Sequence, residues 1–245
     1  MVRTTDLNCD LGEGAGHDAE LMPLITSANI ACGGHAGDEA TMRATIKLAQ
    51  AAGVDFGAHP SFIDRANFGR TELTLPPSQI KKDVELQIRV LASMGRITHV
   101  KPHGALYNRA ARDVEVAKAV VAAVLSVDPR LLLFGLSGGL LVKKGRAAGL
   151  RVVSEVFADR TYQPDGSLTP RSQPNAMVTD AQTCLAQAIR FVTDGKIRAV
   201  GGEDISVKAD TICLHGDGPH AVEFALALRT GLQKVGIRIM PARLR

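Results

Sequence analysis

The chain has 245 residues, of which 45% are hydrophobic and 22% charged, so a sizeable core is expected. No apolar stretch approaches the length of about 20 residues that a membrane span requires, which argues against a membrane protein. The net charge is +4, but Lys and Arg are interleaved with Asp and Glu and form no basic stripe, which argues against nucleic-acid binding. Four widely separated cysteines without a CxxC pair predict free thiols and a cytoplasmic protein.

The segment 5–13 alternates polar and apolar residues, which predicts a strand. Asp6, Asn8 and Asp10 share one face of this strand, and three apolar residues share the other. A strand that packs against helices turns its apolar face toward them, so the polar face is expected to line a barrel lumen or a cleft. Glu13 follows in a glycine-rich loop.

Two further strands are predicted at 27–31 and 54–58, and each ends in a loop that carries a histidine, His35 and His59. A helix lies between them, because apolar residues recur there at helical spacing. Asp38 stands at the start of this helix, where its carboxylate can act as the N-cap.

A long connection follows the third strand and contains Asp64 and Arg70. Connections of this length inside a compact domain are often functional. Ser78 is expected to cap the next helix, which has one apolar stripe and ends near Gly95.

The run THVKPHGALYN at 98–108 predicts a short strand that leads into a loop. Side chains alternate along a strand, so His99, Lys101 and His103 are expected to share one face. Unpaired charges are costly to bury, and three titratable groups on one short track are therefore unusual in a purely structural core. We interpret this segment as one wall of an active site.

The strand predicted at 131–134 is followed by Gly135-Leu136-Ser137-Gly138-Gly139. This sequence matches the G-x-S-x-G turn that presents a nucleophilic serine between a strand and a helix. Glycine-rich turns are also common where strands lead into helices, so Ser137 is kept as an alternative nucleophile.

The remaining part of the chain repeats the alternation of strand and helix. A strand is predicted at 151–156, which contains Glu155 and is followed by Asp159 and Arg160. The long loop 162–177 is expected to act as a lid. Thr179 with a glutamine three residues later resembles a capping box. The other predicted elements are a helix at 113–125, a two-stranded excursion at 198–207, a strand at 210–214 that ends in His215 and Asp217, and a terminal strand at 237–240.

Seven or eight alternations of strand and helix in one short chain predict a parallel sheet covered by helices. At least six of the seven strand ends carry polar residues, whereas an open sheet would place ligands only near its switch point. A closed (β/α) barrel brings all these ends to one rim, which is where such barrels hold their active sites. We therefore expect residues 1–245 to form one β/α barrel domain.

Six segments resemble the LamB/YcsF family: DLNCDLGEG, NIACGGHAGD, GAHPSFIDRANFGR, HVKPHGALYN, SEVFADRTY and LHGD. The resemblance extends over nearly the whole chain. It implies an irregular (β/α) barrel of the glycoside hydrolase/deacetylase type. It also implies an A subunit that acts with B and C subunits as an ATP-dependent 5-oxoprolinase, opening the lactam of 5-oxoproline to L-glutamate while ATP becomes ADP and phosphate.

Such a reaction needs a base, an acid and cations for phosphate and substrate carboxylate. Lys101 and Arg160 are the candidate cations. No Walker A sequence is present, so ATP is expected to bind mainly to partner subunits or to a non-P-loop site. The candidate catalytic residues are Asp10, Glu13, His35, His59, Lys101, His103, Glu155 and His215, and the candidate substrate- or phosphate-binding residues are Asn8, Asp64, Arg70, Asp159, Arg160 and Asp217.

Three alternatives remain open. The histidine-rich rim also fits a metal-dependent, deacetylase-like hydrolase acting on a carbohydrate or small amide, so a divalent metal is kept as a second cofactor besides ATP. Ser137 with His215 and Asp159 would form a serine-based triad. The chain could also bind the substrate without catalysis and pass it to its partners.

Overall fold

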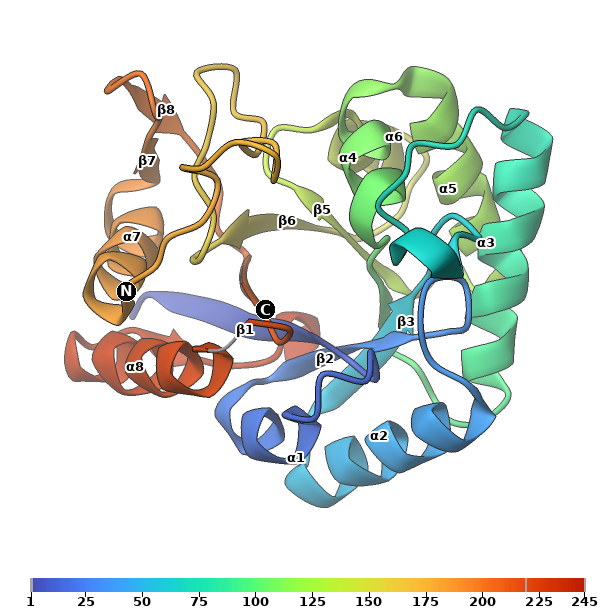
Figure 1. Cartoon of the computed structure of the whole chain (residues 1–245), viewed down its shortest axis with the longest axis horizontal. Coiled ribbons are helices and arrows are strands. Elements are labelled where there is room, and N and C mark those ends of the chain that lie inside the picture. Colours follow the sequence, from blue (N-terminus) through green and yellow to red (C-terminus); the bar gives the residue numbers. More distant parts are fainter. Residues whose placement is uncertain (1, 219, 245) are drawn as a thin grey trace.

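The computed structural model describes residues 2–218 and 220–244, and seven parallel strands in it close into a barrel (Figure 1). The last strand of the ring pairs with both the sixth and the first, which closes the sheet. This confirms the predicted β/α barrel. The ring consists of β1 (Thr4–Leu11), β2 (Ser27–Ala31), β3 (Asp55–His59), β4 (His99–Val100), β5 (Leu132–Leu136), β6 (Val152–Phe157) and β9 (Thr211–His215).

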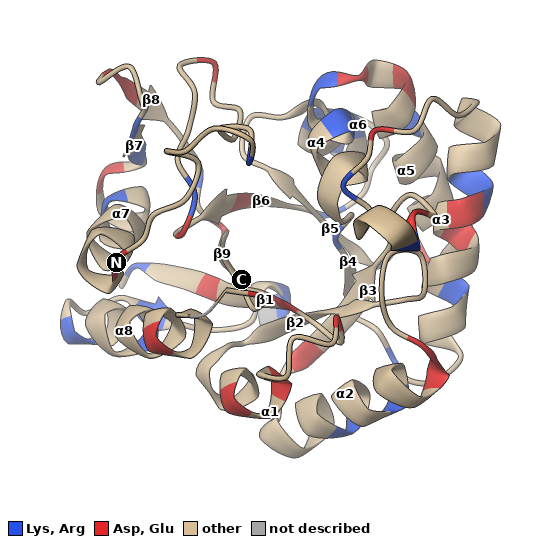
Figure 2. Cartoon of the chain, viewed as in Figure 1, with Lys and Arg blue, Asp and Glu red and all other residues tan. Residues whose placement is uncertain are grey.

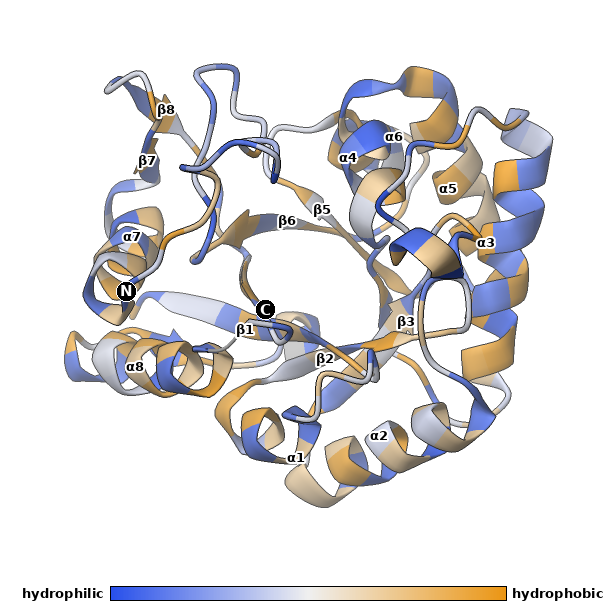
Figure 3. Ribbon diagram, in the orientation of Figure 1, coloured by the Kyte–Doolittle hydropathy of each residue, from blue (hydrophilic) through white to orange (hydrophobic). Residues whose placement is uncertain are grey.

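Helices surround the ring, and the main core lies between them and the strands (Figure 1). These helices carry both hydrophobic and hydrophilic residues, as expected for amphipathic helices with one buried face (Figure 3). They are α1 (Asp18–Leu21), α2 (Glu39–Ala52), α3 (Pro77–Ala92), α4 (Gly104–Arg112), α5 (Val114–Val127), α6 (Leu140–Ala147), α7 (Ala181–Asp194) and α8 (Ala221–Lys234), with short 3-10 turns at Met22–Leu24, Arg65–Asn67 and Ala242–Leu244.

Three short strands lie outside the closed ring. β10 (Arg238–Ile239) pairs in parallel with the first residues of β1 and is the predicted terminal strand. β7 (Lys196–Arg198) and β8 (Asp204–Ser206) form an antiparallel hairpin, which confirms the predicted excursion. The choice between seven and eight strands is thus resolved as seven in the ring and β10 beside it.

The structure corrects two of the predicted helix caps. The Asp38 side chain accepts an N–H at the start of α2 and is the N-cap that the sequence predicts. Ser78 caps nothing, because α3 begins at Pro77, whose fixed φ suits the first helical position. The cap of α7 is Asp180 rather than Thr179, since the Asp180 carboxylate accepts the N–H three residues later.

Charges of both signs are distributed over the outer helices (Figure 2). On α3, for example, Glu85 forms ion pairs with Lys81 and Arg89 one turn away on either side. Within residues 2–218 and 220–244, no helix is both long enough and apolar enough to cross a bilayer.

Candidate active site

Polar side chains joined by hydrogen bonds fill the lumen of the barrel. Asn8 donates from Nδ2 to Glu155 Oε1 at 2.9 Å and to Thr211 Oγ1 at 2.7 Å. Asn29 in turn donates to Asn8 Oδ1 at 2.7 Å and to Asp10 Oδ1 at 2.8 Å. Asn8 and Asp10 therefore point inward, as the alternation along β1 predicts, and the network fixes where each carboxylate oxygen lies.

Lys101 lies at the centre of this network and is 1% exposed. Its Nζ is 2.8 Å from Asp10 Oδ1 and 3.0 Å from Glu155 Oε1. The same atom is 3.2 Å from Asn8 Oδ1 and 3.0 Å from Cys213 Sγ. Burial alone would favour the neutral amine, but the Asp10 carboxylate raises the pKa of Lys101 well above its usual value. The ammonium group is surrounded by acceptor atoms of the protein, so Lys101 acts as the counter-ion of two buried carboxylates.

Four side chains from four successive strand ends meet at the mouth of the lumen: Glu13, His35, His59 and His103. Glu13 Oε1 lies 3.0 Å from His35 Nε2 and 3.3 Å from His103 Nδ1. His59 Nε2 lies 3.0 Å from His103 Nδ1. One ligand atom from each residue lies within 4.8 Å of the others, so the group has the composition and spacing to hold a metal ion. We call these four residues the His/Glu cluster.

The pKa values of three residues in the His/Glu cluster differ from their usual values, namely those of His35, His103 and Glu13. Burial disfavours the imidazolium and lowers the pKa of His35 to about 4, and it lowers the pKa of His103 as well. Burial would raise the pKa of Glu13, but the neighbouring rings of His103 and His35 outweigh it and hold that pKa far below its usual value. The cluster therefore contains a carboxylate beside two rings, His35 and His103, that resist protonation.

A second imidazole and carboxylate pair lies across the mouth. His215 Nδ1 is 2.9 Å from Asp159 Oδ2, and the same carboxylate accepts the backbone N–H of His215. These contacts hold the pKa of Asp159 below its usual value despite its burial. Because Asp159 fixes one ring nitrogen, the other nitrogen of His215 is free to act on a ligand.

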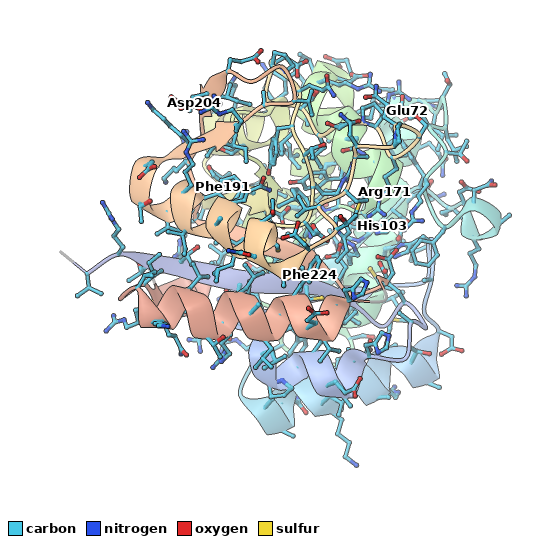
Figure 4. All side chains as sticks on the ribbon, turned by 60° about the vertical axis from the view of Figure 1, so that its left-hand side comes forward. Glu72, His103, Arg171, Phe191, Asp204 and Phe224 are labelled. Carbon is cyan, nitrogen blue, oxygen red and sulfur yellow. The ribbon has the colours of Figure 1, made fainter. Side chains whose placement is uncertain are left out.

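A cavity of about 250 Å³ opens between the two groups. Two arginines on the lid side contribute to its wall, and Figure 4 shows Arg171 and His103 on the same side of the molecule. The lid segment expected at 162–177 thus lies over the mouth, and its residues 168–171 line the cavity. The cavity walls include Asp10, Lys101, Tyr107, Arg160, Arg171 and His215.

The remaining candidate binding residues occupy different positions. Arg70 lines the cavity and forms an ion pair with Asp217 at its rim, with 2.7 Å between Nη2 and Oδ2. Arg160 is buried and donates to the backbone carbonyls of the lid, and burial, together with the nearby Arg171, lowers its pKa to about 10. Asp64 lies outside the cavity wall, where its carboxylate accepts hydrogen bonds from within its own loop.

Sequence reasoning missed several residues of the site. Tyr107 lines the cavity from α4, and its hydroxyl has no hydrogen-bond partner among the residues that the structure describes. Arg171 of the lid reaches the same wall, and Asn29 holds both Asn8 and Asp10. Tyr107 lies within the HVKPHGALYN segment, but without a predicted helix at 104–112 its direction could not be inferred.

The geometry of Ser137 does not match that of a nucleophilic serine. Its Oγ accepts the backbone N–H of Lys208 at 2.8 Å, and Ser137 lines a different pocket from the one that His215 lines. Within the described ranges, Phe68 is the one residue other than glycine with positive φ, so Ser137 lacks the strained backbone of a nucleophile turn.

We therefore expect that replacing Ser137 with alanine leaves the turnover of the assembled enzyme close to that of the wild-type protein. A serine-directed phosphonate is expected to leave the chain unlabelled, as mass spectrometry would show. Stoichiometric labelling of Ser137 together with loss of turnover would restore the serine mechanism.

The chain is similar to known proteins over nearly its whole length. It is 50% identical over 251 residues to the A subunit of 5-oxoprolinase from Geobacillus kaustophilus (strain HTA426), covering 99% of this chain and 98% of that protein. The crystal structure of the lactam utilization protein from Thermus thermophilus superposes with a TM-score of 0.90 at 43% identity, covering 97% and 99% of the two chains.

A more distant similarity concerns the fold alone. The peptidoglycan deacetylase PdaC from Bacillus subtilis matches with a TM-score of 0.52 at 12% identity, covering 98% of this chain and 87% of that one. This match supports the expected deacetylase type of barrel. The family model described as LamB/YcsF matches residues 5–244. The chain therefore belongs to the LamB/YcsF family.

Proposed function

We propose that this chain is the lactam-opening subunit of an ATP-dependent 5-oxoprolinase, which converts 5-oxoproline to L-glutamate while ATP becomes ADP and phosphate. The names of two relatives, one an A subunit of 5-oxoprolinase and the other a lactam utilization protein, support this proposal. The observation that carries it is the convergence of the His/Glu cluster, the His215–Asp159 pair and the arginines of the lid on one small cavity.

The proposed reaction opens a five-membered lactam, an unactivated amide whose ring closes again readily. ATP transfers its γ-phosphoryl group to the lactam oxygen, and the resulting imidate carbon is a better electrophile. One water molecule adds to this carbon, the C–N bond breaks and frees the amine, and the phosphoryl group leaves to a second water molecule as phosphate. ATP thus supplies the energy that keeps the ring open.

The residues around the cavity offer the groups that these steps need. The His/Glu cluster contains a carboxylate and imidazole nitrogens that can accept hydrogen bonds from the attacking water molecule and so orient it. His215, held by Asp159, can donate a proton to the departing nitrogen. Arg70 and Arg171 line the same cavity and can bind phosphate or the substrate carboxylate.

We further propose that ATP is bound mainly by B and C partner subunits, since the sequence holds no Walker A motif. All four cysteines are buried free thiols, which supports a location in the reducing cytoplasm.

The purified chain alone is therefore expected to release little or no glutamate from 5-oxoproline, with or without ATP. Adding the B and C subunits and ATP should produce glutamate and ADP in equal amounts, measured by coupled enzyme assays. Omitting each subunit in turn is the control. Robust ATP-dependent turnover by the single chain would contradict the dependence on partners.

The second candidate function is a metal-dependent, deacetylase-like hydrolase. The His/Glu cluster favours it, because histidine and carboxylate ligands build hydrolytic metal centres. This function predicts that the chain alone releases acetate from N-acetylated carbohydrates and that a chelator abolishes this release. Acetate release without any lactam turnover in the full complex would favour this function over the first.

A further inference from the structure

Two backbone carbonyls fix the ring tautomers at the His/Glu cluster. His59 Nδ1 lies 2.7 Å from the carbonyl oxygen of Lys101, and His103 Nε2 lies 3.0 Å from that of Phe68. A carbonyl oxygen can only accept, so each of these nitrogens must carry the hydrogen. In the neutral rings, His59 Nε2 and His103 Nδ1 therefore present lone pairs.

These two lone pairs face each other across 3.0 Å. Glu13 Oε1 lies 3.3 Å from His103 Nδ1 and 3.7 Å from His59 Nε2, and it adds a negative charge to the same spot. Asp10 Oδ2 lies 3.3 Å from His59 Nε2. Acceptors repel one another at such distances unless a cation lies among them, and this cation is either a shared proton or a metal ion.

The separations of Glu13 Oε1 from the three ring nitrogens are close to those between ligands around a transition metal. Four ligands at about 2.0–2.1 Å around tetrahedral Zn²⁺ lie about 3.3–3.4 Å from one another. The separations of the Glu13 oxygen from the ring nitrogens of His35, His103 and His59 are 3.0, 3.3 and 3.7 Å. Mg²⁺ and Ca²⁺ prefer oxygen ligands, whereas three imidazoles and one carboxylate suit Zn²⁺.

We propose that Glu13, His35, His59 and His103 form a binding site for one divalent transition-metal ion, with Zn²⁺ as the best match. The carbonyls of Lys101 and Phe68 orient two of the rings, as outer-shell acceptors commonly do around metal-bound histidines. His59 and His103 also line the cavity, which gives an ion a path into the site.

Burial and stacking of the rings favour the metal over a shared proton. His35 and His103 stack with their centroids 3.7 Å apart and their planes within 2°, and both rings are buried. A proton would place imidazolium charge in a ring that has lost its contact with water, which is costly. A metal ion leaves the rings neutral, and the converging lone pairs can coordinate it.

His35 differs from the other two histidines. Its Nδ1 is buried and meets no hydrogen-bond partner within the described part of the chain. This ring therefore lacks the outer acceptor that orients His59 and His103, and we expect it to contribute least to affinity.

The test measures metal binding by the full chain without partners or substrate, so its failure is separable from failure of the proposed function. Chelated and dialysed protein is titrated with Zn²⁺ by calorimetry and with Co²⁺ by visible absorption. We expect one ion per chain and the absorption of four-coordinate Co²⁺. H103Q and E13Q should each weaken binding at least about 100-fold, more than the loss of an outer-shell partner does, while H35Q should weaken it less.

H215Q is the matched control, because it removes a mouth histidine outside the cluster and should bind the ion as the wild-type protein does. Circular dichroism of each variant separates loss of a ligand from loss of folding. Absence of a stoichiometric ion in the wild-type protein would overturn the proposal in favour of a shared proton. Unchanged affinity in both H103Q and E13Q would overturn the assigned ligands.

Discussion

Replacing Lys101 with methionine is expected to abolish lactam turnover and to lower the free energy of unfolding by about 3–5 kcal/mol, the cost of breaking a buried ion pair. The substitution leaves the carboxylates of Asp10 and Glu155 without their counter-ion in the lumen. Methionine has a similar volume, so little of this loss is expected to come from a cavity. Urea-induced unfolding gives the change in stability, and glutamate release by the assembled complex gives the change in turnover.

A double variant provides the control for this prediction. Adding Glu155→Gln to Lys101→Met removes one of the two uncompensated charges, and we expect it to restore part of the stability. Turnover should stay low, because Asp10 still lacks its partner. Equal stability of the wild-type protein and the Lys101→Met variant would show that the ion pairs around Lys101 are not coupled to folding.

Replacing Glu13 with glutamine is expected to reduce turnover at least about 100-fold, the usual contribution of a positioned acid or base. Glutamine keeps the shape of the side chain but removes the negative charge that faces His35 and His103. Initial rates of glutamate release by the assembled complex provide the measurement.

Glu39→Gln is the matched control, because Glu39 lies on the exposed side of α2 and pairs with Arg43. We expect this variant to retain wild-type turnover and wild-type stability, and circular dichroism shows whether Glu13→Gln is folded. Full activity of Glu13→Gln would show that the charge of the His/Glu cluster is not needed for the reaction.

Local patterns in the sequence predict most of the barrel correctly. The alternation along 5–13 places Asn8 and Asp10 in the lumen, and the alternation along 98–108 places His99 and Lys101 there. Period-two patterning works here because each strand has helices on one side and the polar lumen on the other.

Other features could not be predicted, because they depend on distant contacts or on short elements. The helix at 104–112 begins at Gly104, a residue that usually ends helices, and so the position of Tyr107 could not be inferred. Lys101 forms ion pairs with Asp10 and Glu155, and these pairs could not be predicted because both carboxylates are far away in the sequence. The cap of α7 lies one residue from the predicted position, because Asp180 and its neighbour Thr179 are both good caps.

The most direct test of the central claim is a crystal structure of the assembled complex with 5-oxoproline bound. We expect the lactam in the cavity between His103 and His215, with Arg171 of the lid closing over it. A lactam bound entirely within a partner subunit, or beside Ser137, would contradict the account.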